Sequence, residues 1–372
     1  MTEVTVSGEG GSPTSDPRGF LSVVLSGAIK FGASDVHIRS GNPVMLRIDG
    51  VIRSLKGAPE LSKPEIEALI DEMLPDYHKN LYRENNQADT SYGDNNGNRV
   101  RVNIFTTLGA PAIVMRIIAR DIPKLADLGL PPEVNSISEL KHGLVIFTGA
   151  TGSGKSTSMA ALLNKVNRSR KEHILTIEDP VEFVFTEKRC VISQREVGID
   201  VPNFAMAMKA ALREDPDIIL MGEMRDQESI EIALDAAETG HLVFSTLHAP
   251  TAADAITRLV SSFTGDAQQT IRAKLAQNLR VVVSQRLVPR KDGGRVAGCE
   301  VMNVNARARE LILDPLRIKD IADLVKSGDK VDGMLNFDKH LAQLVESDVI
   351  DKDVAIYNAT SPTDLSLALE GF

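Results

Sequence analysis

The feature of this sequence that most restricts its fold is a glycine-rich segment near its middle. Residues 149–156 read Gly-Ala-Thr-Gly-Ser-Gly-Lys-Ser, which matches the phosphate-binding loop pattern G-x-x-x-x-G-K-[ST] at every fixed position. An apolar stretch at residues 144–147 precedes this segment, and residues 157–167 read as a helix. The strand, loop and helix together predict an α/β fold built around a nucleotide site.

The residue types of this loop explain its chemistry. Glycines let the backbone wrap closely and turn its N–H groups toward phosphate oxygens, and the start of the following helix adds positive potential. Lys155 would place its ammonium group on the β- and γ-phosphates, and Ser156 would offer its hydroxyl to Mg²⁺. We therefore expect ATP and Mg²⁺ as cofactors, with the nucleotide bound by Gly149, Ala150, Thr151, Gly152, Ser153, Gly154, Lys155, Ser156 and Thr157.

After the loop, strand and helix patterns alternate. Apolar runs typical of strands and helical patterns follow each other at residues 173–177, 204–212, 217–221, 227–238 and 242–247. This alternation predicts a mostly parallel sheet with helices on both faces. From Ala252 onward the pattern is mainly helical, with one strand-like stretch at residues 295–302.

Acids and histidines follow or flank the predicted strands. Glu223 comes just after the strand at residues 217–221, where it would hold the Mg²⁺ shell or polarise the attacking water. The segment Glu-Asp-Pro-Val-Glu, which ends at Glu182, follows another strand. His241 and His248 bracket the strand at residues 242–247, either as packed or capping residues or as sensors of the γ-phosphate.

The chain before the loop reads as a separate domain. Residues 1–16 are rich in Gly, Ser and Thr and predict a disordered tail. A helix at residues 20–31 and several short strands, two of them joined by an Asp-Gly turn, predict a small α+β domain. Breaks in the pattern place the domain at residues 17–119, a linker at 120–130, and the α/β domain with a helical C-terminal part at 131–372.

Composition excludes several classes of function. The net charge of −9 and the absence of Trp argue against a nucleic-acid partner. Two distant cysteines, Cys190 and Cys299, cannot form a four-cysteine zinc site and read as ordinary thiols that are buried or idle. The sequence has no apolar run of the ~18 residues that a membrane span needs, and the first residues do not form a signal peptide, so we expect a cytoplasmic protein.

Four segments in order, GATGSGKST, ILTIEDPVEF, LREDPDIILMGEMRD and AAETGHLVFSTLHAPTAADAITRL, resemble the Walker A, Asp, Walker B and His boxes of the secretion ATPases. Within these ATPases the chain resembles most the type IV pilus retraction ATPases, the PilT/PilU group. ASDVHIRSGNPVMLRIDG is similar to that group's N-terminal domain, and MLNFDKHL to its C-terminal segment. The resemblance implies a PAS-like N-terminal domain followed by a RecA-like ATPase domain, and a homo-hexamer with ATP at the subunit interfaces.

The resemblance also implies a role for each matching residue. Glu182 would be the general base for water, Glu223 the Walker B acid, and His241 and His248 the His-box pair. Two further residues would reach the phosphates from the N-terminal domain, namely Arg101 and Arg116. The implied partners are an inner-membrane pilus platform protein, which would hold the ring at that membrane's inner face, and a paralogous retraction ATPase.

Two positions depart from the pattern of the retraction group. Gly109 stands where that group often has a third arginine, and Leu313 replaces an arginine of its C-terminal motif. Three alternatives to a retraction motor remain open at this point. These are a type II secretion or pilus-extension ATPase, a non-motor P-loop enzyme such as a small-molecule kinase, and a nucleotide-gated scaffold without catalysis.

Overall fold

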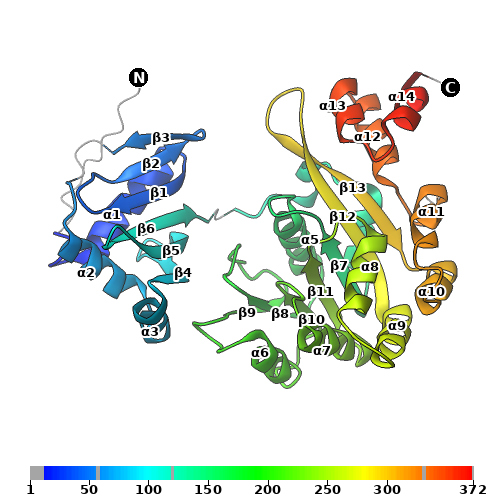
Figure 1. Ribbon diagram of the computed structural model, residues 1–372, viewed down its shortest axis with the longest axis horizontal. Coiled ribbons are helices and arrows are strands. Elements are labelled where there is room, and N and C mark those ends of the chain that lie inside the picture. Colours follow the sequence, from blue (N-terminus) through cyan, green and yellow to red (C-terminus); the bar gives the residue numbers. More distant parts are fainter. Residues whose placement is uncertain (1–11, 56–58, 119–120, 329–331, 371–372) are drawn as a thin grey trace. The chain divides into compact units, whose positions relative to one another are not determined.

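The computed structural model describes residues 12–55, 59–118, 121–328 and 332–370. Most of the predicted tail, the Arg120 end of the predicted linker and the last two residues lie outside the described residues. The chain divides into two compact units, with the main boundary between Asp121 and Ile122 (Figure 1). Two short segments, residues 179–184 and 196–202, group with the first unit.

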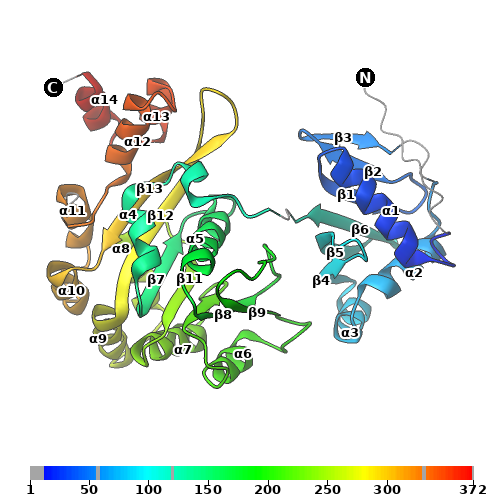
Figure 2. The same ribbon diagram turned by 180° about the vertical axis from the view of Figure 1, so that it is seen from behind.

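The first unit is built on a six-stranded sheet with the order β3-β2-β1-β6-β5-β4. All its strand pairs are antiparallel. Its elements are α1 (Pro17–Lys30), β1 (Ala33–Arg39), β2 (Met45–Ile48), β3 (Val51–Ser54), α2 (Lys63–Met73), α3 (Asp76–Asn85), β4 (Gln87–Gly93), β5 (Arg99–Thr107) and β6 (Ala110–Ile117). The predicted helix at residues 20–31 is confirmed as α1, which lies across the sheet in Figure 2.

Local chemistry explains where these elements begin and turn. The Asp16 side chain accepts a hydrogen bond from the Gly19 N–H, and Pro17 occupies the first turn of α1, so both features favour a helix start. The predicted Asp-Gly hairpin is confirmed, since Ile48 pairs with Val51 across Asp49 and Gly50. Both turn residues have positive φ, as this two-residue turn requires.

The second unit contains a seven-stranded sheet with the order β13-β12-β7-β11-β10-β8-β9. Its first elements are two 3₁₀ helices (Leu125–Leu128 and Ile137–Glu139), α4 (Pro132–Ser136), β7 (Gly143–Thr148), α5 (Lys155–Ser169), β8 (His173–Glu178), β9 (Val191–Glu196), α6 (Phe204–Ala211), β10 (Ile218–Met221), α7 (Gln227–Glu238) and β11 (Leu242–Leu247). The strands β12, β7, β11, β10 and β8 run parallel, which confirms the α/β alternation. β7, β10 and β11 are buried at every position, as strands covered on both faces are.

The C-terminal part of this unit differs in one element from the sequence prediction. It contains α8 (Ala252–Ser261), α9 (Ala267–Asn278), β12 (Leu279–Pro289), β13 (Arg295–Asn303), α10 (Ala306–Leu313), α11 (Asp320–Ser327), α12 (Phe337–Glu346), α13 (Lys352–Asn358) and α14 (Pro362–Glu370). The helical reading of residues 279–289 was wrong, because they form β12 between β7 and β13. The β-branched run at residues 281–283 favours a strand, and both of its neighbours complete its hydrogen bonding.

Three further observations bear on the sequence analysis. The predicted linker segment 122–130 groups with the second unit, and Leu125 is buried in that unit's core. Cys190 and Cys299 are buried free thiols, as predicted. None of the described helices combines the length and the apolarity that crossing a bilayer demands.

Candidate active site

The phosphate-binding loop lies between β7 and α5 in the second unit. Its glycines have φ values of 142° for Gly149, 78° for Gly152 and 91° for Gly154, all in the region that favours glycine. A Cβ atom on Gly149 would lie 2.4 Å from the Gln285 carbonyl oxygen and 2.6 Å from Ser153 Oγ. Position 149 therefore accepts glycine alone, and the loop is packed against β12, which contributes Gln285.

Lys155 begins α5 and turns its side chain back over the loop. Its Nζ atom donates to the carbonyl oxygens of Gly149 (2.8 Å) and Ala150 (2.9 Å), and the residue is 8% exposed. The Ser153 hydroxyl is also buried and has no hydrogen-bond partner among the described residues. An ammonium group and an unsatisfied hydroxyl in a glycine-rich loop at the start of a helix suit the oxygens of a phosphate chain.

Four parallel strands end at the same edge of the sheet as this loop. Thr148 of β7 pairs with Leu247 of β11, and Met221 of β10 pairs with Ser245 of β11 and Ile177 of β8. The residues that follow these strands therefore emerge side by side with the loop. In open α/β sheets this carboxyl edge is where ligands bind.

Glu223 and His248 meet at this edge. The His248 Nε2 atom lies 3.4 Å from Glu223 Oε1, and the Arg225 Nε donates to Glu223 Oε2 at 2.8 Å. The Glu223 side chain is only 16% exposed. Thr246 fixes the turn before it, because its hydroxyl donates to the Gly222 carbonyl oxygen at 2.6 Å. The acid after β10 is thus held on both oxygens.

Two arginines near His248 were missed in the sequence analysis. Arg225 contacts Glu223 directly, and Arg258 Nη1 donates to the His248 carbonyl oxygen at 2.8 Å. Arg225 stands two residues after Glu223, in the motif GEMRD. The sequence spacing therefore carried a signal for Arg225, whereas the contact of Arg258 depends on how α8 packs after β11.

His241 is not brought together with His248. It precedes β11, whereas His248 follows it, so the two rings lie at opposite ends of one strand. The Nδ1 atom of His241 is 2.9 Å from the Ala236 carbonyl oxygen and 3.1 Å from Thr239 Oγ1. Within one chain, His241 therefore belongs to the edge of the sheet opposite the phosphate loop.

The remaining predicted site residues belong to the first unit. Arg101 on β5 and Arg116 on β6 are direct cross-strand partners, and both are exposed. Arg116 Nε donates to Asp35 Oδ1 at 3.0 Å. Glu182 is exposed on the segment 179–184, which groups with this unit.

The donor groups at the sheet edge also fit a magnesium ion. Mg²⁺ prefers hard oxygen ligands and keeps several waters, so one or two protein oxygens together with phosphate oxygens suffice. The Ser156 hydroxyl in the first turn of α5 and the Glu223 carboxylate after β10 are oxygens of this kind. No group of three or more His, Cys, Asp or Glu residues suited to a metal occurs in the described part of the chain.

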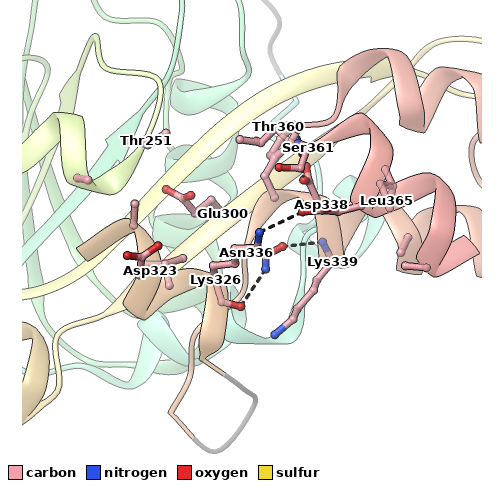
Figure 3. A pocket seen from close by; sticks show the side chains of 17 residues that line it. Thr251, Glu300, Asp323, Lys326, Asn336, Asp338, Lys339, Thr360, Ser361 and Leu365 are labelled. Carbon is pink, nitrogen blue, oxygen red and sulfur yellow. Dashed lines mark hydrogen bonds and ion pairs between the residues drawn. The ribbon is translucent and has the colours of Figure 1, made fainter. Parts of the chain in front are cut away.

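The second unit also contains a hollow that is separate from the phosphate-binding loop. It measures about 340 Å³ and is lined by residues of α8, β13, α11, α12 and α14 (Figure 3). Its charged groups are largely engaged: Asp338 accepts from the backbone N–H groups of Thr360 and Ser361, and Lys326 pairs with Asp364 at 3.1 Å. None of the predicted site residues is among the described residues that line it, so it is not part of the nucleotide site.

Comparison with known proteins places this site in a family. The model of the family described as type II/IV secretion system protein matches residues 18–353, which include every predicted site residue. The chain belongs to this family. As a member of the secretion ATPases it is a nucleotide-binding P-loop ATPase.

Individual members of the secretion ATPases match over nearly the whole chain. This secretion ATPase is 40% identical over 342 residues to the type IV pilus retraction ATPase PilT of Pseudomonas aeruginosa, with 92% of this chain and 98% of the relative covered. It is 39% identical over 347 residues to a twitching motility protein of Neisseria gonorrhoeae, with 93% and 92% covered. The resemblance to the retraction group that the sequence motifs indicate is therefore confirmed.

A solved structure agrees with the fold. The crystal structure of the pilus retraction motor PilT with bound ADP superimposes with a TM-score of 0.83 at 40% identity, and the match covers 92% of this chain and 98% of that chain. This likeness confirms the predicted fold class, an N-terminal α+β domain followed by a RecA-like ATPase domain.

Proposed function

We propose that this chain powers the retraction of a type IV pilus, the movement that underlies twitching motility, by hydrolysing ATP. The observation that carries the proposal is the sheet edge where the Lys155 loop, Glu223 and His248 come together. That edge supplies a phosphate cradle and a strand-end acid, and the near full-length similarity to PilT supports the coupling to pilus movement.

The residues would divide the work as follows. The backbone amides of residues 149–156 and the Lys155 ammonium hold the triphosphate, while Ser156 and Glu223 hold the magnesium shell. A bound Mg²⁺ would neutralise charge on the β- and γ-phosphates. Glu182 would accept a proton from the attacking water.

The charged groups outside the loop would stabilise the transition state. Arg101 and Arg116 would bind the γ-phosphate oxygens, a task worth ~10³–10⁵ in rate for arginines in other phosphoryl-transfer enzymes. His248 would respond to the γ-phosphate through its contact with Glu223. His241 lies at the other end of β11, and we place its His-box role at the nucleotide site of a neighbouring subunit.

The assembly that we propose is a homo-hexamer with ATP at the subunit interfaces. Residues 17–119 would act as the PAS-like domain, and the start of the predicted linker 120–130, around Ile122 and Pro123, would let it rotate against the ATPase domain at 131–372. The ring would work in the cytoplasm at the inner membrane, against a pilus platform protein and beside a paralogous retraction ATPase. Nucleic acid is not a proposed partner, in line with the net charge of −9.

Deletion of the gene in its native host tests this function. We expect cells with more surface pili and no twitching, because pili that extend would not be withdrawn. Cells without pili would instead indicate an extension motor, and unchanged pili with a secretion defect would indicate a type II secretion ATPase.

Complementation of the deletion strain tests whether twitching requires ATP hydrolysis or only the presence of the protein. Lys155→Ala should fail to restore twitching and should abolish phosphate release by the purified chain, because the loop loses its ammonium group. Lys165→Ala is the matched control, since Lys165 lies on the same helix and donates to the Asn135 carbonyl oxygen at the surface. A Lys155→Ala protein that hydrolyses ATP at the normal rate would contradict the assignment of the loop.

A further inference from the structure

A single row of charged residues crosses four adjacent strands of the first unit. Asp35 on β1 pairs in register with Arg47 on β2 and with Arg116 on β6, and Arg116 pairs in register with Arg101 on β5. The residues next to this row along the strands, Val36, Met115 and Val102, are fully buried in the core. Since side chains alternate between the two faces of a sheet, the charged row lies on the face away from the core.

Asp35 is the acid of this row, and its side chain is more buried than those of the three arginines. Its side chain is 8% exposed, whereas that of Arg116 is 72% exposed. The Ser34 hydroxyl donates to Asp35 Oδ2 at 2.8 Å, and Arg47 Nε lies 3.7 Å from the same oxygen. Burial opposes ionisation of Asp35, but the Ser34 and Arg116 hydrogen bonds outweigh it, and the pKa of Asp35 is lowered. The acid is therefore a fixed negative charge.

Asp35 contacts Arg116 in a way that leaves most of the guanidinium group available. The bond at 3.0 Å uses the Nε of Arg116, and the two terminal amino groups of Arg116 have no partner among the described residues. A guanidinium group presents five N–H donors in a rigid fork, so one edge can be anchored while the other binds an anion in a defined direction. Lysine has no second edge and could not do both.

Arg101 lies directly opposite Arg116 on the neighbouring strand, so two positive charges face each other there. Two like charges placed directly opposite each other on antiparallel strands repel and destabilise the sheet. No hydrogen bond or ion pair of the Arg101 side chain occurs within the described residues, so of these two opposed arginines Arg116 alone has an anchoring carboxylate there. Such a pair is understandable if an anion with several oxygens binds both guanidinium groups.

We propose that Asp35 is a positioning residue for ATP hydrolysis, which acts by holding Arg116 in the orientation that binds the γ-phosphate beside Arg101. The inference rests on the proposed function, because it takes the phosphate-binding role of the two arginines from there. Asp35 does not touch the nucleotide itself. It fixes the direction of a long side chain that would otherwise sample many rotamers at the surface.

Steady-state ATPase assays on the purified full chain test this proposal. Asp35→Asn keeps the shape of the side chain and removes its charge, and we expect kcat to fall roughly 10- to 100-fold, the scale of loss for a misplaced catalytic group. The affinity for mant-ADP should stay unchanged, because ADP lacks the γ-phosphate. The matched control is Asp89→Asn, which removes an exposed acid from the same sheet face, where it accepts from Asn103 at 3.3 Å.

A double-mutant cycle with Arg116→Ala distinguishes positioning from a purely structural role. If Asp35 acts through Arg116, then Asp35→Asn should change kcat less than about twofold in the Arg116→Ala background. Equal losses in both backgrounds would overturn the proposal. Normal activity of Arg116→Ala beside an inactive Lys155→Ala would also overturn it while leaving the ATPase function intact.

Arg116→Lys provides a test that does not depend on the folding of an Asp35 variant. The substituted side chain is largely exposed, so the sheet should tolerate it. We expect Arg116→Lys to lose as much kcat as Arg116→Ala, within about twofold, because the single ammonium would stay with Asp35. Wild-type kcat in Arg116→Lys would show that no two-edged contact is needed and would refute the positioning role.

Discussion

At the residue scale, the two strand-end acids of the proposed mechanism have different surroundings. Glu223 is largely buried, and Arg225 and His248 contact its two oxygens. Glu182 is exposed on a segment without regular secondary structure. An acid held on both oxygens is suited to orienting the magnesium shell, whereas an acid exposed to water can accept a proton from it and release it.

This difference predicts the behaviour of Glu182→Gln. The variant should bind ATP with normal affinity, and single-turnover hydrolysis should slow by about 10²- to 10⁴-fold, the usual contribution of a general base. Glu187→Gln is the control, since Glu187 is an exposed glutamate of the same stretch. It accepts a hydrogen bond from the Ile192 N–H, and the oxygen of a glutamine amide can accept the same bond. Loss of ATP affinity with unchanged hydrolysis of bound nucleotide would show that Glu182 is not the base.

At the element scale, the phosphate loop depends on its neighbour β12 as much as on its own sequence. Gly149 has a φ value of 142°, a conformation open essentially to glycine, and its Cα faces the Gln285 carbonyl oxygen of β12. Gly152 also has a positive φ, but a Cβ atom there would meet nothing within 4 Å. Backbone strain affects both positions, and a steric clash affects only the first.

Gly149→Ala should therefore destabilise the protein more than Gly152→Ala. Strain at a positive φ costs about 1–2 kcal/mol, and the clash at position 149 adds to that cost. Urea denaturation of the two variants measures the difference in the free energy of unfolding. Equal destabilisation would mean that the loop shifts away from β12 at little cost.

Elements with a local pattern could be predicted from the sequence, and those defined by distant partners could not. The strands β7, β10 and β11 read correctly because their apolar runs end at glycine or polar residues. β12 did not, because a short apolar run fits a helix and a strand equally well until its neighbours β7 and β13 are known.

The same limit applies to the site. The loop, Glu223 and His248 could be named from strand ends, but the contact between Glu223 and His248 follows from β10 and β11 being neighbours. The link from Asp35 to Arg116 joins residues 81 positions apart and depends on the register of β1 against β6. The local periodicity of a sequence predicts neither the order of the strands in a sheet nor their register.

At the scale of the whole molecule, the C-terminal helices are tied to the large sheet by a buried histidine. His340 of α12 is 3% exposed, and its Nδ1 accepts a hydrogen bond from the Cys299 N–H of β13 at 2.9 Å. The ring is therefore neutral in the folded chain. Burial lowers the pKa of His340 to about 4, from an ordinary value of 6.5.

This histidine predicts how stability changes with acidity. The unfolded chain takes up a proton at His340 near pH 6.5 and the folded chain only near pH 4, so stability is lost as the pH falls through that interval. The loss can reach on the order of 3 kcal/mol. His340→Asn keeps an acceptor for the Cys299 N–H and should show a smaller loss of unfolding free energy between pH 7 and pH 5. A pH dependence equal to that of the wild type would contradict a neutral buried ring.

The two bonds of Lys155 to backbone carbonyl oxygens bear on how the loop exchanges its ligand. When a phosphate draws the Lys155 ammonium toward itself, the Gly149 and Ala150 carbonyl oxygens would stay close by as alternative partners. Departure therefore never strands a bare buried charge, which would otherwise hold the product back. We therefore expect the loop to favour quick exchange of nucleotide over the tightest binding, which suits a motor that has to reload many times for each pilus withdrawn.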